Sequence, residues 1–235
     1  MTMIRSELTV DPSWPVDTTT RMNRMYRYQR HIYDITRRYY LLGRHELING
    51  LVPPSDAHVL EIGCGTGRNL VAAALRYPQA RFYGFDVSTE MLTSAIGAIA
   101  RAGLDGRAKV AHGDATNFTA QGVFGQPVAF DRVMISYSLS MIPDWEAVIE
   151  RATASLKPGG QLHIVDFGDQ SGLPGFAGRA LRRWLALFGV TPRDQLEATL
   201  TQIAVRTGAG LKFDRPYRGY AQAAVLTLPQ RPRPA

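Results

Sequence analysis

Between residues 58 and 168, short apolar runs alternate with longer helical patterns, and this alternation constrains the fold more than any other feature of the chain. The runs that read as strands cover 58–63, 80–87, 108–115, 129–139 and 161–168, and the helical patterns cover 67–77, 88–103 and 144–156. In such a pattern each helix carries the chain back across one face of a sheet, so that consecutive strands run parallel. We therefore predict an α/β fold with a mostly parallel, doubly wound sheet and helices on both faces.

The residues after this region predict that one edge of the sheet is antiparallel, unlike the parallel strands before it. Two helical segments follow one another between Pro174 and Arg206, divided at the sequence GVTPRD. Residues 211–228 then form two extended runs, which we expect to pair as an antiparallel edge. Together with the earlier runs they predict a seven-stranded sheet. The predicted domain spans residues 53–228, and residues 229–235 are expected to be a disordered tail.

Residues 1–52 precede this domain, and we predict that they form an arm followed by a helical cap. Apolar or aromatic residues recur every three or four positions, the spacing of one helix face, at Met25, Tyr28, Ile32, Ile35, Tyr39 and Leu42. Seven arginines lie between residues 21 and 44, where Asp34 is the one acidic residue. The predicted helix is therefore basic, aromatic and amphipathic.

The composition narrows the class of partner and the compartment. A net charge of +7 and a pI near 9.8 favour an anionic partner, such as nucleic acid, an anionic membrane surface or an acidic small molecule. The single cysteine, Cys64, excludes an intramolecular disulfide, and we predict no metal site. The first residues lack the apolar core of a signal peptide, and no window is apolar enough to span a membrane, so we expect a cytoplasmic protein.

Three glycines follow the first strand at alternate positions, in the stretch LEIGCGTGRNL. Gly63, Gly65 and Gly67 leave the backbone without a Cβ, so that a ligand can approach it closely. A dinucleotide-binding turn, G-x-G-x-x-G, would need a glycine where Arg68 stands, which disfavours a dehydrogenase. Glu61 places a negative charge just before the turn, and this charge would repel a pyrophosphate and attract a cationic cofactor.

Four motifs together resemble the class I methyltransferases that use S-adenosylmethionine: E-x-G-x-G-x-G, an acid that ends the second strand, GDA after the third strand, and LKPGG before the fifth. The resemblance covers residues 57–168 and implies a Rossmann-like fold. It implies that Glu61 faces the cofactor's ammonium group, Asp86 the ribose hydroxyls and Asp114 the adenine amine, roles that suit carboxylate acceptors. Met91 would pack on the adenine. The whole predicted set of cofactor-binding residues is Arg44, Glu61, Gly63, Cys64, Gly65, Gly67, Asn69, Asp86, Val87, Met91, Asp114, Ala115 and Ser136.

The run YRYQRHIYDITRRYYLLGR, residues 26–44, resembles the segment before the methyltransferase core of bacterial S-adenosylmethionine:diacylglycerylhomoserine N-methyltransferases. This resemblance implies that three methyl groups pass in turn to the amine of a homoserine head group, giving a betaine lipid. Guanidinium groups suit the head-group carboxylate, and aromatic faces suit a quaternary ammonium product. The residues expected to bind the substrate are Tyr26, Tyr28, Arg30 and Tyr40, with Arg37, Arg38, Arg44 and Tyr39 available beside them.

Methyl transfer to an amine needs a neutral amine in line with the sulfonium methyl, and positioning with exclusion of water supplies most of this. The candidate catalytic residues are Tyr137, His31 and Tyr33. Tyr137 follows the fourth strand at the carboxyl edge of the sheet, where ligands approach in this fold. His31 or Tyr137 is expected to accept a hydrogen bond from the amine, and Tyr33 belongs to the aromatic cage.

A lipid substrate also requires a way onto a membrane. In residues 175–190 we predict one helix face with Leu181, Trp184, Leu185 and Phe188 and another with Arg179, Arg182 and Arg183. Such faces are typical of helices that lie in a membrane interface. We therefore expect peripheral association with the inner, anionic face of the cell membrane.

Other functions fit the same core. A quinone, a phospholipid amine or another small amine is an alternative acceptor. The high pI also fits an RNA or DNA methyltransferase, although the chain has no separate recognition domain and carries SYSL where an NPPY-like tetrapeptide would stand. A non-catalytic binding module is disfavoured by the intact glycine turn with Glu61, Asp86 and Asp114.

Overall fold

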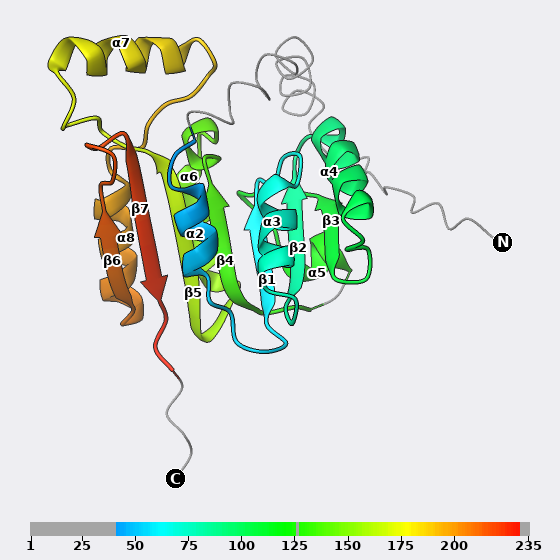
Figure 1. The fold of residues 1–235 in the computed structure, drawn as a ribbon. Helices are drawn as coiled ribbons and strands as arrows, with labels where there is room; N and C mark the ends of the chain where they lie inside the picture. The colour runs from blue at the N-terminus through cyan, green and yellow to red at the C-terminus, as the bar shows by residue number, and fades with distance from the viewer. Residues whose placement is uncertain (1–40, 126, 231–235) are drawn as a thin grey trace.

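The computed structural model describes residues 41–125 and 127–230. Seven strands form one sheet in the order β3-β2-β1-β4-β5-β7-β6 (Figure 1). The strands are β1 (His58–Ile62), β2 (Arg81–Asp86), β3 (Ala108–His112), β4 (Phe130–Ser136), β5 (Leu156–Phe167), β6 (Gly210–Asp214) and β7 (Ala221–Thr227). Strand β7 runs antiparallel to both of its neighbours, and the other pairs are parallel. The predicted seven-stranded, mostly parallel sheet is confirmed.

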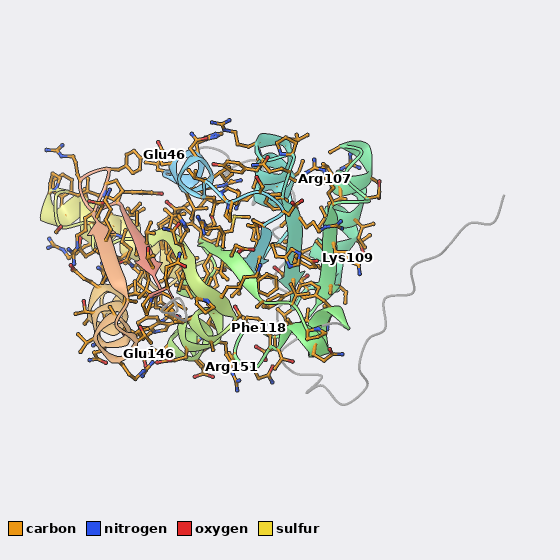
Figure 2. All side chains as sticks on the ribbon, turned by 90° about the horizontal axis from the view of Figure 1, so that it is seen from below. Glu46, Arg107, Lys109, Phe118, Glu146 and Arg151 are labelled. Carbon is orange, nitrogen blue, oxygen red and sulfur yellow. The ribbon has the colours of Figure 1, made fainter. Side chains whose placement is uncertain are left out.

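Helices cover both faces of this sheet. They are α2 (Arg44–Gly50), α3 (Arg68–Arg76), α4 (Thr89–Arg101), α5 (Ala120–Phe124), α6 (Trp145–Ala154), α7 (Gly175–Ala186) and α8 (Leu196–Thr207), with the 3-10 turn η1 (Leu139–Met141). In Figure 1, α2, α3 and α4 lie in front of the sheet, and α6 and α8 lie behind it. Figure 2 shows the same two layers from below, with Glu46 of α2 on one side and Glu146 and Arg151 of α6 on the other.

The strands divide their side chains between two apolar cores. Leu60 and Ile62 of β1 pack into the core under α6 and α8, whereas Val59 packs into the core under α2 and α3. Successive residues of a strand point to opposite faces. Glu61 therefore lies on the same face as Val59, where an apolar residue would be the ordinary choice.

Two predicted helix boundaries illustrate how local sequence sets the elements. Ser88 caps α4 as predicted, because its side-chain oxygen accepts a hydrogen bond from the Met91 backbone N–H at 3.3 Å. Strand β5 begins earlier than the predicted residue 161. It starts at Leu156, and the proline and glycines of LKPGG form an irregularity within it, where Gly159 has φ +76°.

The predicted basic, aromatic helix, whose spacing runs from Met25 to Leu42, does not continue through Gly43. This glycine has φ +83° and precedes α2, and a Cβ there would lie 3.0 Å from Val165 Cγ2 of the sheet. Such a backbone conformation favours glycine. A separate helix, α2, therefore starts at Arg44 and packs against α3 and β5. The rest of the predicted helix lies outside the described residues.

Helix α7 lies across the end of the sheet, beyond the carboxyl ends of the parallel strands (Figure 1). Three of the four residues of the predicted apolar face of this helix turn toward the protein: Leu185 is buried, and Leu181 and Phe188 pack against the core under α2 and α3. The fourth, Trp184, is 37% exposed and packs against Phe188. The prediction that this face points toward a membrane is therefore wrong for Leu181, Leu185 and Phe188. Packing them on the protein removes their apolar surface from water, which is favourable. Among the described residues, no helix is long and apolar enough to cross a bilayer.

Candidate cofactor site

The site lies at the carboxyl ends of β1, β2 and β4, where ligands bind in open α/β sheets. A small cavity there brings together residues from the start of α2, the end of β1, the glycine turn, α3 and the end of β4. Its lining residues are Leu41, Arg44, Glu61, Gly63, Cys64, Gly65, Thr66, Arg68, Asn69 and Ser136. Seven of the predicted cofactor-binding residues are therefore together in one cavity. The sequence prediction missed Leu41, Thr66 and Arg68.

The three glycines of the turn have different physical reasons to be glycine. All have positive φ, namely +68° at Gly63, +53° at Gly65 and +74° at Gly67. A Cβ on Gly63 would lie 2.7 Å from Ser138 Cβ, and one on Gly67 would lie 3.0 Å from Ala95 Cβ. A Cβ on Gly65 would meet no described atom within 4 Å. Gly65 is therefore the glycine whose open side faces the cavity, and a ligand can approach its backbone.

Glu61 is a buried carboxylate with one oxygen unpaired. Its side chain is 1% exposed, and Oε1 accepts a hydrogen bond from Asn69 Nδ2 at 2.8 Å. Asn69 Oδ1 in turn accepts a hydrogen bond from Arg44 Nε at 2.8 Å. Within residues 41–125 and 127–230, Oε2 has no hydrogen-bond partner. Burial, helped by the nearby Asp86 charge, raises the pKa of Glu61 to about 8, against the opposing effects of Asn69, Arg44 and the Leu70 backbone N–H.

An unpaired buried carboxylate oxygen is costly, so such groups are normally hydrogen-bonded. An ammonium group at Oε2 would supply both a donor and the opposite charge. The methionine end of S-adenosylmethionine carries such a group, so the residues of this cavity fit that cofactor.

Asp86 connects the glycine turn to the start of α4. Its Oδ2 accepts a hydrogen bond from the Gly65 backbone N–H at 2.8 Å, and its Oδ1 accepts one from Ser88 N–H at 2.9 Å. These bonds fix the plane of the carboxylate, and a carboxylate oxygen can accept more than one hydrogen bond. A ribose diol needs two acceptor oxygens at a fixed spacing, which this arrangement provides.

The predicted adenine-binding residues lie beyond Asp86. Met91 is buried and packs with Met141 and Phe188, two residues that the sequence prediction missed. Asp114 follows β3, and its Oδ1 accepts hydrogen bonds from both the N–H and the hydroxyl of Thr116 at 2.8 Å. The backbone oxygen of Val87 lies 3.1 Å from His112 Nε2. Ala115 is buried beside Phe118 in the core under α6 and α8.

Tyr137 is buried at the end of β4 with φ +56°. Its hydroxyl donates a hydrogen bond to the Leu42 carbonyl oxygen at 2.6 Å, and its ring packs edge-on against Phe167. Burial raises the pKa of Tyr137 well above its usual range. The phenol therefore fixes the chain that leads into α2. Its predicted contact with a substrate amine stays a prediction. Neighbouring Ser136 has a buried Oγ without a hydrogen-bond partner in the described part of the chain.

Several predicted residues lie outside the described residues, namely Tyr26, Tyr28, Arg30, His31, Tyr33, Tyr40 and the further residues Arg37, Arg38 and Tyr39. Their roles stay predictions. The chain enters the site directly after them, because Leu41 and Arg44 line the cavity. Across the described ranges, no group of acidic, histidine or cysteine side chains could hold a metal ion.

Comparison with known proteins agrees with this geometry. Residues 59–160 match the methyltransferase domain family. Trans-aconitate 2-methyltransferase of Paracidovorax citrulli is 32% identical over 121 residues, which cover 51% of this chain and 42% of that protein. The matches to the first curated relatives thus span less than half of the relatives' own length. The matched family region contains the glycine turn, Asp86 at the end of β2 and Asp114 after β3.

Solved structures share the fold over more of the chain. The S-adenosylmethionine-dependent methyltransferase SibL in its apo form has a TM-score of 0.64 at 20% identity. The aligned region covers 85% of this chain and 58% of the SibL chain. Phosphoethanolamine N-methyltransferase 2 of Haemonchus contortus, in complex with S-adenosyl-L-methionine, has a TM-score of 0.63 at 18% identity and covers 80% and 52%. Residues 59–160 are thus similar to the methyltransferase domain family, and the fold of the described residues is that of S-adenosylmethionine-dependent methyltransferases.

Proposed function

We propose that the protein is an S-adenosylmethionine-dependent methyltransferase whose acceptor is an amine. The observation that carries the cofactor assignment is Glu61, a buried carboxylate with an unpaired Oε2 beside the open backbone of Gly65. Asp86, held by two backbone N–H groups, supports the same assignment at the ribose. S-adenosylmethionine supplies a methyl group from a sulfonium and leaves as the neutral thioether S-adenosylhomocysteine.

The chain's own residues then have to bind and orient the acceptor. In an in-line transfer the amine lone pair would form the new C–N bond while the S–C bond breaks. A primary or secondary amine would then release a proton to water, whereas a tertiary amine has none to release and would become quaternary. Arg44 hydrogen-bonds to Asn69 and lines the cavity, so its position is fixed from the protein side. The buried Tyr137 hydroxyl holds Leu42, and these two contacts together orient the chain that enters the site.

The acceptor we propose is diacylglycerylhomoserine, whose amine would receive three methyl groups in turn. The support comes from the likeness of residues 26–44 to the corresponding segment of the betaine-lipid N-methyltransferases. The similar fold of phosphoethanolamine N-methyltransferase 2, which by its name methylates an amine, is compatible with this acceptor.

An oxygen acceptor is the second candidate. The relatives that match about half of the chain include trans-aconitate 2-methyltransferase and the ubiquinone biosynthesis O-methyltransferase of Xylella fastidiosa, which is 30% identical over 126 residues. By their names these proteins act on a carboxylic acid and in quinone synthesis. Because the matched region contains the cofactor residues, it distinguishes poorly between nitrogen and oxygen acceptors.

Two experiments test the proposal in order. Calorimetric titration with S-adenosylmethionine should show binding to the wild type and to Glu146→Gln, an exposed charge change on α6, and strong loss of binding in Glu61→Gln and Asp86→Ala. Equal binding by all four proteins would contradict the cofactor assignment.

Mass spectrometry of lipids from cells that supply diacylglycerylhomoserine then tests the acceptor. Additions of one, two and three methyl groups, absent with Asp86→Ala, would support the N-methyltransferase. An unmodified lipid, from cells whose purified protein binds S-adenosylmethionine, would refute the betaine-lipid acceptor and leave the oxygen acceptor as the candidate.

A further inference from the structure

Helix α7 exposes a second apolar face that the protein does not cover among the described residues. Phe176 is 73% exposed and Leu187 is 77% exposed. Positions 176, 179, 183 and 187 are spaced by three or four residues, so they share one face of the helix. This face lies opposite Leu185, which is buried. Large apolar side chains gathered in this way usually mark a binding surface.

The same face carries uncompensated positive charge. Helix α7 has three arginines and no acidic residue. Arg182 is neutralised by Asp194, with an N–O distance of 2.7 Å, and also donates to Gln170. Arg179 and Arg183 are exposed, and neither forms an ion pair within the part of the chain that the structure describes. Basic residues interleaved with Trp, Phe and Leu characterise helices that lie in the interface of an anionic bilayer.

The helix is anchored beside the cofactor site. Phe188, just after α7, packs against Met91 and Met141. The following loop is tied to η1, because Thr191 N–H donates to the Ser140 carbonyl at 2.8 Å and Arg193 donates to the Leu139 carbonyl at 3.0 Å. A surface that binds α7 would therefore lie next to the edge of the sheet at which an acceptor has to enter.

We propose that the exposed face of α7, formed by Phe176, Arg179, Arg183 and Leu187, docks the protein on an anionic lipid bilayer. The apolar side chains enter the interface, the two arginines meet anionic head groups, and the carboxyl edge of the sheet faces the membrane. This inference deepens the proposed function, since it rests on a lipid acceptor for its biological purpose, but its physical test needs no acceptor.

The test is co-sedimentation of the full chain with vesicles of phosphatidylcholine alone or mixed with phosphatidylglycerol. Arg179→Gln/Arg183→Gln should weaken binding to the anionic vesicles about 30-fold, since each basic residue near such a surface contributes about 1 kcal/mol. Phe176→Ser/Leu187→Ser should weaken it at least about tenfold. The matched control is Leu75→Ser/Val205→Ser, which removes two exposed apolar side chains from α3 and α8 and should bind as the wild type does.

Equal binding by the α7 variants and the wild type, or an equal loss in the control, would overturn the proposal. So would a dimer that light scattering detects in the wild type and that both α7 variants abolish, because a second copy would then cover the face.

Cofactor titration and methylation of detergent-dispersed acceptor separate this inference from the proposed function. If docking and function are both right, the α7 variants bind the cofactor and methylate detergent-dispersed acceptor as the wild type does, and they lose activity only on vesicle-embedded acceptor. If only the acceptor is wrong, the variants still lose vesicle binding.

Discussion

Replacing Glu61 by glutamine should stabilise the ligand-free protein while it abolishes cofactor binding. The side chain is buried, and one of its oxygens has no partner within residues 41–125 and 127–230. A glutamine keeps an acceptor oxygen for Asn69 Nδ2 and carries no charge. In the wild type, folding at a pH where the unfolded chain has an ionised Glu61 requires the side chain either to take up a proton or to bury its charge, and both cost free energy. The glutamine variant does not have this cost.

The size of the effect follows from the pKa of Glu61, which burial raises from 4.5 to about 8. The folded state binds a proton that the unfolded state loses, so the free energy of unfolding falls as the pH rises from 4.5 to 8. One pKa unit corresponds to about 1.4 kcal/mol. The wild type is therefore destabilised by about 3 kcal/mol at neutral pH and by about 5 kcal/mol at pH values above 8, and by almost nothing near pH 4.5.

Urea unfolding of the ligand-free wild type and Glu61→Gln measures this difference. The glutamine variant should gain little near the acid end of the range, and its advantage should grow as the pH rises to 8. The exposed control Glu146→Gln should show no such growth. Saturating S-adenosylmethionine should reverse the order, because it stabilises only the protein that binds it. An advantage that is constant with pH, or that shrinks as the pH rises, would refute the assignment of Glu61 as a buried acid.

Four further substitutions separate binding from folding. Gly65→Ala should cost about 1 to 2 kcal/mol of unfolding free energy because of its left-handed backbone and should weaken cofactor affinity more than tenfold by calorimetry; unchanged affinity would show that no ligand approaches that backbone. Gly63→Ala should destabilise more strongly in thermal unfolding, since its Cβ would meet a neighbouring side chain at 2.7 Å, and equal stability of the two variants would contradict the packing argument. Tyr137→Phe should lose about 1 kcal/mol of stability through the missing bond to Leu42 and leave the pH dependence of the methylation rate unchanged, whereas a shifted pH profile would indicate that the phenol contacts the acceptor. Asp86→Asn should weaken cofactor binding less than Asp86→Ala, because the amide keeps one acceptor oxygen; the reverse order in calorimetry would contradict a ribose contact.

The fold could be predicted from the sequence wherever one periodicity ran without interruption. The buried strands and the Ser88 cap were predictable because each depends on residues that are neighbours in the chain. The start of β5 was not, since Pro158 and Gly159 look like a break but lie within an irregular strand. The break at Gly43 was also missed, because the helical spacing continues through Leu42 and the turn depends on the close approach of Val165.

In the site, motifs could suggest the residue types but not how they interact. Glu61 and Asp86 were identified from their places near the ends of strands, and the structure adds that Glu61 has one unpaired oxygen and that Asp86 is held by backbone donors. Helix α7 shows the limit most clearly. Its sequence contains two apolar faces, and amphipathic spacing alone does not determine which of them packs on the protein. Leu185 is buried and Leu187 is exposed.

The contacts at the entry of the chain link cofactor and acceptor physically. The family match begins at residue 59, so the segment with the proposed acceptor residues lies outside the region shared with the methyltransferase domain family. Directly after that segment, two residues contact the core. The Leu42 carbonyl oxygen accepts a hydrogen bond from the Tyr137 hydroxyl, and Arg44 donates one to Asn69, which donates one to Glu61. An ammonium group bound at Glu61 would favour the charged carboxylate and so alter the charge that Arg44 faces. We therefore expect donor binding to be coupled to the position of Arg44 through the hydrogen bonds from Arg44 to Asn69 and from Asn69 to Glu61, and linkage requires that acceptor binding raise cofactor affinity if the cofactor raises affinity for the acceptor.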